Sequence, residues 1–209
     1  MNFFQYQPQV PYVFTNDTGY RDTLVMVDIT TRAQILQRIQ SVVSSYYDYV
    51  IADYERPDTV AVSLYGHARY TWLVLLLNNM FGLHDWPLNY DEFQRYLTAK
   101  YGSLDRAQAV TTDADYYFDA THTYVTADEY ANLSDANKGM TLPARYCFTS
   151  LGLPIDSASY DTLSEAEQGI VLTPYEYELN ANEQKRRIKF VDGRFLAAID
   201  REYRVLFRE

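Results

Sequence analysis

The sequence predicts an α+β fold with a small core, flanking amphipathic helices, an extended N-terminal arm and an irregular insertion. Two observations predict it. Hydrophobic residues make up 47% of the 209 residues, which is enough to build a packed core. Short β-branched runs alternate with stretches of helical period, except in residues 105–173, where periodicity is weak. We therefore expect an arm, strand and helix over 1–47, a core module with a third helix over 48–104, the insertion over 105–173, and C-terminal helices over 174–209.

The N-terminal part is expected to be an extended arm followed by a strand and a helix. Pro8 and Pro11 block helix formation in residues 1–22, and the apolar run LVMVDI over 24–29 favours a strand. Thr31 and Gln34 then have the spacing of a capping box, which opens a helix. The apolar residues that follow fall on one helical face: Ile35, Ile39, Val42, Val43 and Tyr46.

The central part is expected to contain a strand over 47–54 and a turn made by Glu55-Arg-Pro-Asp58. Asp58 would be the N-cap of a short helix over 59–64, and Gly66 would end that helix.

A second helix, over 68–78, is nearly all apolar, so we expect it to be buried on most sides. Asn78 and Asn79 suit its C-terminal end, where a left-handed residue is needed. A third helix should begin at Asp91 and end at Gly102.

The insertion contains two similar stretches, YANLSDANKGM from Tyr130 and YDTLSEAEQGI from Tyr160. Each has an acidic start and a glycine stop. We interpret them as two uses of the same capping chemistry, with a true duplication as the alternative. After the insertion, residues 175–188 carry acids first and bases last, as a helix dipole favours, and the apolar stripe of a last helix begins at Phe195.

The composition of the chain limits the classes of partner that it is expected to bind. Net charge is −10, so we expect no nucleic-acid partner. The apolar run 72–77 is far too short to span a bilayer, and the N-terminus predicts no signal peptide, so no membrane partner is expected. The single cysteine, Cys147, is typical of a reducing compartment. The 21 tyrosines favour assembly or binding, because tyrosine is enriched at interfaces.

Motifs for catalysis, metal or cofactor binding do not stand out in the sequence. The three histidines lack the HExxH spacing of zinc sites. The acidic stretch from Asp113 lacks the glycine and glutamate of a calcium loop, having Phe118 and Tyr124 at those positions. Asp53 with Glu55, or His84 with Asp85, could form an acid–base pair, but an acidic protein carries many such neighbours. We therefore expect no enzyme, no cofactor and no metal.

Residues 49–89 carry a more specific pattern. This stretch resembles the signature of the baseplate wedge protein 53 family of contractile-tailed bacteriophages. The matching pieces are Asp53, Glu55-Arg56-Pro57-Asp58-Thr59, Leu64-Tyr65-Gly66, Trp72, Asn78-Asn79 and Asp85-Trp86-Pro87. The resemblance also covers Val27–Arg32 as VDITTR, Tyr175–Asn180 as YEYELN, and Lys185–Ile188 as KRRI.

The same stretch is similar, more distantly, to LysM modules, whose unit is strand–helix–helix–strand. The resemblance therefore implies a LysM-like βααβ core over 48–90. Two departures are visible. Glu55-Arg-Pro-Asp58 stands where sugar-binding modules favour a Gly-Asp-Thr turn, and a helix begins at Asp91 where the closing strand should follow.

The resemblance implies a virion structural protein of the tail baseplate, assembled in the host cytoplasm, that joins neighbouring wedges into the symmetric ring around the hub. The implied partners are other wedge subunits, the sheath-initiating subunit and the central hub. The alternatives are a LysM-type peptidoglycan- or glycan-binding module and, with the weakest support, a wall hydrolase. For partner contacts we expect the residues around the two turns of the module: Tyr54, Arg56, Tyr65, His67 and Trp86. Trp72, within the apolar helix, is expected in the core, and for Trp86 core packing is the alternative to a partner contact.

Overall fold

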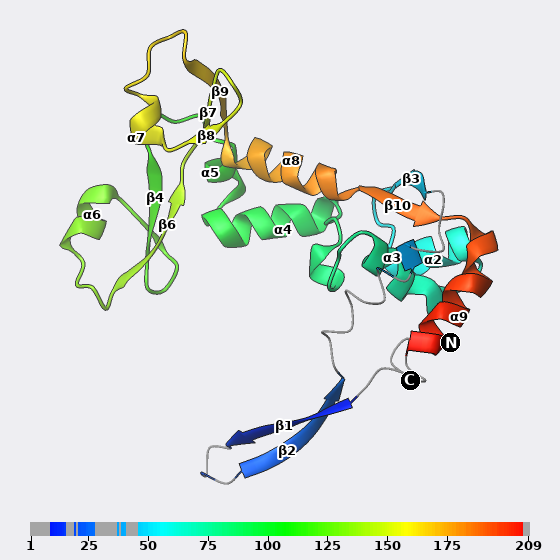
Figure 1. Ribbon diagram of the computed structural model, residues 1–209. Helices are drawn as coiled ribbons and strands as arrows, with labels where there is room; N and C mark the ends of the chain where they lie inside the picture. The colour runs from blue at the N-terminus through cyan, green and yellow to red at the C-terminus, as the bar shows by residue number, and fades with distance from the viewer. Residues whose placement is uncertain are drawn as a thin grey trace. The chain divides into compact units, whose positions relative to one another are not determined.

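The computed structural model describes residues 9–15, 19, 21–27, 37, 39–40 and 46–206 of the chain (Figure 1). It contains both helices and strands, which confirms the predicted α+β class. The chain forms two compact units. Residues 1–87 and 185–209 make unit 1, and residues 88–184 make unit 2. The helices after Pro87 and before Lys185 thus group with the insertion and not with the core module, because they share a hydrophobic core with it.

The N-terminal residues form a β-hairpin. Strand β1 (Gln9–Thr15) pairs antiparallel with β2 (Arg21–Val27), with Tyr12 opposite Leu24. Residues 9–15 of the expected arm are therefore a strand, because Pro11 is tolerated in a strand with one neighbour. Large apolar side chains are exposed on both faces of the hairpin, among them Tyr12, Val13, Leu24 and Val25.

The predicted helix after the hairpin lies mostly outside the described residues. Gln37, Ile39 and Gln40 are helical, and Ile39 is buried. Tyr46 was expected on that helix but begins β3 (Tyr46–Val50). A run of three tyrosines in five residues favours the strand over the helical end.

Unit 1 is built from β3, two helical segments and a distant closing strand. Helix α2 (Pro57–Tyr65) is followed by the 3₁₀ turn η3 (Ala68–Tyr70) and α3 (Thr71–Leu77). The closing strand is β10 (Arg187–Val191), which pairs antiparallel with β3 and places Ile188 opposite Tyr49. Residues 187–188 were expected to end a helix, but they belong to this strand. In the sequence, the residues of unit 2 therefore lie between the second helix and the closing strand of the strand–helix–helix–strand order.

The core of unit 1 lies between this sheet and the helices. Its buried apolar side chains include Val60, Leu73, Val74, Leu76, Ile188 and Val191. The last helix, α9 (Leu196–Leu206), follows the short turn η5 (Gly193–Phe195) and buries Ile199 and Tyr203 in the same core. Trp72 packs against Tyr203 with ring centroids 5.3 Å apart, as expected for a core residue.

The helix ends of unit 1 follow the predicted chemistry with one exception. Gly66 has φ 75 and Asn79 has φ 55, so both adopt the left-handed conformation expected after α2 and α3. The predicted N-cap, Asp58, is wrong: α2 begins at Pro57 with Arg56 as its N-cap. Proline is well suited to the first helical position, and the Thr59 hydroxyl accepts a hydrogen bond from the Arg56 amide at 3.0 Å.

Within the described part of the chain, no single helix is long and apolar enough to cross a membrane. Helices α2 and η3–α3 pass that test only as a pair, by length and composition, and they are bent by 112° relative to each other.

Three helices of unit 2 contribute to a second core. Helix α4 (Tyr90–Tyr101) starts at the N-cap Asn89 and ends at Gly102, close to the predicted bounds. It is followed by α5 (Leu104–Gln108), and α8 (Pro174–Lys185) follows the insertion. On α8, the Asn182 side chain bonds both backbone groups of Leu88, at 2.8 and 3.0 Å.

The expected irregular insertion is instead two regular three-stranded sheets. The first contains β4 (Asp115–Asp119), β5 (Tyr124–Val125), α6 (Ala127–Asn132) and β6 (Lys138–Pro143), with strand order β5-β4-β6. The second contains β7 (Tyr146–Thr149), β8 (Pro154–Ile155), α7 (Ser157–Tyr160) and β9 (Gln168–Leu172), with strand order β8-β7-β9.

These two sheets share their register residue by residue. Tyr117 lies opposite Val125 in the first and Cys147 lies opposite Ile155 in the second, a constant shift of 30 positions. The same shift relates the pair Tyr116–Leu142 to the pair Tyr146–Leu172 and the irregularity after Tyr117 to that after Cys147. Shared capping chemistry alone does not fix strand register. The segment is therefore a structural repeat. A true duplication was the alternative in the sequence analysis, where shared capping chemistry was preferred. We name residues 115–143 repeat 1 and residues 145–173 repeat 2.

A tyrosine and a glycine fix the irregular position in each repeat. The Tyr130 hydroxyl donates to the Gly139 carbonyl at 2.9 Å, and Tyr160 does the same to Gly169. A Cβ on Gly169 would lie 2.2 Å from the Thr149 carbonyl oxygen, and one on Gly139 would lie 2.0 Å from that of Asp119. The identical residues in the two sequence stretches thus mark a close backbone approach.

Replacing Gly169 with alanine is expected to lower the free energy of unfolding by about 2–3 kcal/mol, because backbone atoms have to move to admit the methyl group. Gly193→Ala is the matched control, since a Cβ there meets nothing within 4 Å. Urea denaturation followed by circular dichroism checks this. Equal stability of the two variants would show that the close approach is absent in solution.

Candidate interaction site

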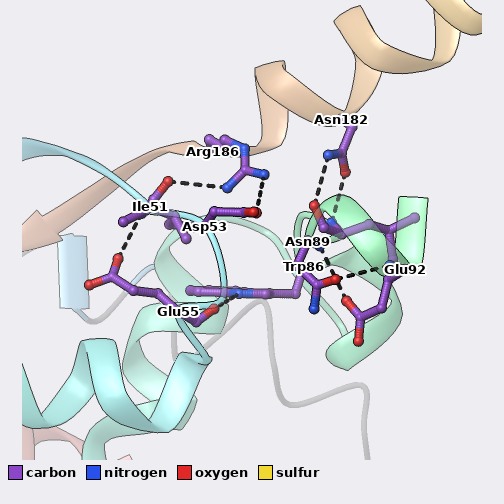
Figure 2. Close-up of polar contacts among 10 residues, drawn as sticks. Ile51, Asp53, Glu55, Trp86, Asn89, Glu92, Asn182 and Arg186 are labelled. Carbon is purple, nitrogen blue, oxygen red and sulfur yellow. Dashed lines mark hydrogen bonds and ion pairs between the residues drawn. The ribbon is translucent and has the colours of Figure 1, made fainter. Parts of the chain in front are cut away.

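The turn between β3 and α2 is held by its two acidic side chains (Figure 2). Asp53 forms an ion pair with Arg186 at 2.9 Å, next to the start of β10. The Glu55 carboxylate accepts from the Tyr49 hydroxyl at 2.8 Å and from the Ala52 amide at 2.8 Å. The two carboxylates considered as an acid–base pair therefore each bind a separate structural partner.

Trp86 lies in the core and not on the expected contact surface. Its side chain is 6% exposed, and its indole nitrogen donates to the Glu55 carbonyl at 2.7 Å (Figure 2). The expectation of a partner contact is wrong for this residue, because the indole ring closes the core beneath the turn and its only polar atom is satisfied there.

Tyr65 is also occupied within unit 1. It is half-buried, its hydroxyl accepts from the Val191 amide at 3.2 Å, and its ring packs edge-on against Tyr70. Burial raises the pKa of Tyr65 to about 12. The residue therefore joins the end of α2 to β10 and offers little surface to a partner.

The other three expected residues are exposed but do not form one patch. Tyr54 is 59% exposed, and Arg56 makes an exposed ion pair with Asp58 at 3.4 Å. His67 follows α2 at its other end, where its Nδ1 accepts from the Arg69 amide at 3.1 Å and caps η3. Tyr54 and Arg56 are thus separated from His67 by the length of α2.

Sequence reasoning missed a pair of exposed apolar side chains after α3. Phe81 is 76% exposed and Leu83 is 64% exposed. Asp85, on the 3₁₀ turn η4 (Leu83–Asp85), accepts from the Phe81 amide at 2.6 Å and from the Gly82 amide at 3.3 Å. This folds the loop back on itself and presents both side chains outward. The sequence contains one signal for this loop, the aspartate four residues after Phe81, because an aspartate side chain can accept hydrogen bonds from nearby backbone amides and so close a turn.

Raising the pH is expected to destabilise the fold through Tyr65. Its folded-state pKa, about 12, exceeds the ordinary value of 10.0, so the neutral form is favoured in the folded state. The stabilisation that comes from this raised pKa is complete below pH 10 and is lost between pH 10 and 12, about 3 kcal/mol in all. Unfolding free energies measured from pH 8 to 11.5 for the natural chain and for Tyr65→Phe check this. Identical slopes above pH 10 would contradict it.

The residues considered for metal or calcium binding have structural roles as well. Residues 115–119 are strand β4, so the stretch from Asp113 is not a calcium loop. Asp119 accepts from the Thr121 hydroxyl at 2.7 Å and from the Thr123 amide at 2.9 Å, which lowers its pKa. Among the residues that the structure describes, no three His, Cys, Asp or Glu side chains are grouped to hold a metal ion.

We compared the chain with models of known protein families and with curated proteins, and it matches none of either.

Proposed function

We propose that the chain is a structural component of a phage tail baseplate wedge and joins adjacent wedge subunits into the ring around the central hub by protein–protein contacts. This proposal rests on the structural roles of the residues that match the baseplate family signature. Asp53, Glu55 and Trp86 hold the turn before α2. Asn78 joins α3 to β10 through hydrogen bonds of 2.7 and 2.9 Å with the backbone of Lys189. These signature residues therefore hold the strands and helices of unit 1 together, and we name this arrangement the scaffold.

The strand–helix–helix–strand order of β3, α2, α3 and β10 supports the LysM-like part of the proposal. In this view unit 2 is inserted between the second helix and the closing strand, which explains why no strand follows Pro87 in the sequence.

Binding to proteins is supported by apolar side chains on the outside of this scaffold. Phe81 and Leu83 stand on a loop that is closed by Asp85, so little conformational entropy is lost when they are covered. Grouped exposed apolar residues are typical of contact sites. We propose other wedge subunits, the sheath-initiating subunit and the central hub as partners, in several copies per virion, with no catalytic role.

The double variant Phe81→Ser, Leu83→Ser is expected to weaken binding to wedge subunits at least tenfold, because a few well-packed side chains carry most of the binding energy of an interface. Stability should change little, since both side chains are exposed. Val110→Ser, at a site that is 92% exposed in unit 2, is the matched control. Biolayer interferometry with purified wedge subunits measures both. Unchanged affinity of the double variant would remove this loop from the proposed contact.

A LysM-type glycan-binding module is the second candidate, favoured by the same strand–helix–helix–strand order. Its test is retention of the chain on purified peptidoglycan, compared with an Arg56→Ala, Asp58→Ala variant of the exposed turn. Retention that this variant loses would favour glycan binding over the assembly role.

A further inference from the structure

The β3–β10 sheet of unit 1 is closed at one edge. At β10 the Asn78 side chain takes the place of a neighbouring strand, because it accepts from the Lys189 amide at 2.7 Å and donates to the Lys189 carbonyl at 2.9 Å. The backbone groups of Lys189 therefore point away from β3. Lys189 lies opposite Asp48, so these two residues form a pair without mutual hydrogen bonds.

The other edge of this sheet, along β3, is open. Backbone direction alternates along an antiparallel pair, so the N–H and C=O groups of Tyr46, Asp48 and Val50 point away from β10. Ile51 agrees with this alternation, since its amide donates to the Arg186 carbonyl at 2.9 Å. The outward groups have no hydrogen-bond partner among the residues that the structure describes, and all three residues are exposed. Strand β3 has neither a proline nor a bulge that would block a further strand.

The β1–β2 hairpin also has one blocked edge and one open edge. Pro11 lies on β1 opposite Val25, and its nitrogen, which carries no hydrogen, points outward as proline requires in a strand. The Thr23 amide on β2 donates to the Asp22 carboxylate at 2.8 Å, an exposed contact that an incoming strand can replace. The proline blocks the edge of β1, whereas β2 presents the outward backbone groups of Val25 and Arg21.

Each of the two sheets has one apolar face. On the hairpin, this face carries Asp22 as its one charged side chain among the described residues, and the others are Val10, Tyr12, Phe14, Leu24 and Met26. Four of these apolar side chains are between 46% and 58% exposed. In unit 1, Tyr49 and Ile188 share the face that packs on the core, and the opposite face is exposed at Asp48 and Val50.

An antiparallel join of β2 to β3 matches these faces. Residues whose backbone groups meet in such a join carry their side chains on the same face. Arg21 and Val25 then share the exposed face with Asp48, which brings side chains of opposite charge to one face. The apolar face of the hairpin continues the side of the sheet that carries Tyr49. A parallel join would place the apolar face beside Asp48 instead.

We propose that the open edge of β3 receives the β1–β2 hairpin of a second copy of this chain, with β2 antiparallel to β3. A second copy is the occupant because both open edges lack a strand partner within the described part of one chain. The joined sheet, in the order β1-β2-β3-β10, has Pro11 at one edge and Asn78 at the other, so neither edge admits a further strand. A hairpin alone is marginally stable in water, and the join provides the additional strands that it needs.

Sedimentation velocity of the full chain, from about 1 µM to about 300 µM, measures the contact between copies. No wedge subunit is present, so the result is independent of the baseplate proposal. We expect reversible association of the natural chain. Val25→Pro places a proline on the joining edge of β2 and should weaken association at least about tenfold. Val13→Pro is the matched control, because it makes the same change on the outward edge of β1, at 56% exposure against 61%, and should leave association unchanged.

A mixing experiment identifies the donor and the acceptor. Asp48→Pro blocks β3 but keeps the hairpin, and it spares the bonds between β3 and β10 because the Asp48 amide points outward. Val25→Pro blocks the hairpin but keeps β3. Each variant alone should associate weakly, and an equimolar mixture should form a complex that contains one copy of each.

Three results would overturn the proposal. The first is a natural chain that stays monomeric at about 300 µM, as expected if the hairpin joins β3 of its own chain. The second is equal weakening by Val13→Pro and Val25→Pro, which would indicate contact through the faces of the hairpin. The third is a mixture that associates no better than its components. Should circular dichroism show that Asp48→Pro does not fold, Val50→Pro removes another outward N–H and takes its place.

Discussion

Replacing Glu178 with alanine is expected to lower the free energy of unfolding by about 3–5 kcal/mol. Glu178 lies on α8 and is 9% exposed. Its carboxylate accepts from Lys100 at 2.6 Å, from the Tyr101 hydroxyl at 3.0 Å and from the Tyr96 hydroxyl at 3.1 Å. Without it the Lys100 ammonium keeps only the Tyr96 hydroxyl as an acceptor, and the Tyr96 and Tyr101 hydroxyls lose the carboxylate to which they donate.

The size of this loss follows from the cost of an unpaired charge, and not from the strength of the pair itself. Burial alone would lower the pKa of Lys100, but hydrogen bonds to Glu178 and Tyr96 outweigh it and raise that pKa. Lys100 is therefore charged at neutral pH, and removing the carboxylate leaves this charge without its ion-pair partner.

Glu178→Gln is the matched variant. It keeps an acceptor for the tyrosines but loses the ion pair, so an intermediate loss of about 1–3 kcal/mol is expected. Urea denaturation at pH 7 gives both values. A loss below about 1 kcal/mol for the alanine variant would mean that the cluster does not hold α4 and α8 together.

Replacing Trp86 with alanine is expected to lower the free energy of unfolding by about 3–5 kcal/mol, because a large buried side chain leaves a cavity. The Glu55 carbonyl also loses its donor. Trp86→Phe removes the donor but less volume, so its loss should be smaller.

Thermal unfolding by calorimetry measures the Trp86 variants. If Trp86→Ala kept full stability and instead weakened partner binding, the indole would be a contact residue, as the sequence suggested. That outcome would contradict the buried position described for unit 1.

Local signals in the sequence predicted the elements of unit 1 that depend on neighbouring residues. Gly66 and Asn79 mark helix ends because their left-handed conformation is a local requirement. The closing strand β10 was not predicted, since its pairing with β3 joins residues far apart in the chain and no local pattern records it. Its first two residues, Arg187 and Ile188, end a stretch with helical charge order and were therefore assigned to that helix.

The repeat shows a second limit. Its shared residues are visible in the sequence, but strand register depends on long-range pairing and on the bulge at each glycine. For this reason the two stretches were assigned to shared capping chemistry.

The contact residues illustrate a third limit. Tyrosine and tryptophan suit either a core or an interface, and only tertiary partners such as Val191 and Glu55 decide between them. Phe81 and Leu83 were overlooked because they lie in an expected loop, where no periodic pattern shows which apolar side chains are exposed.

The most direct test of the proposed assembly role is co-expression of the full chain with the products of its neighbouring genes, followed by size-exclusion chromatography and mass spectrometry. We expect the chain to elute in a stable complex that contains wedge subunits at a fixed ratio. Elution of the chain alone as a monomer at micromolar concentration, with every wedge subunit present and folded, would contradict the proposal.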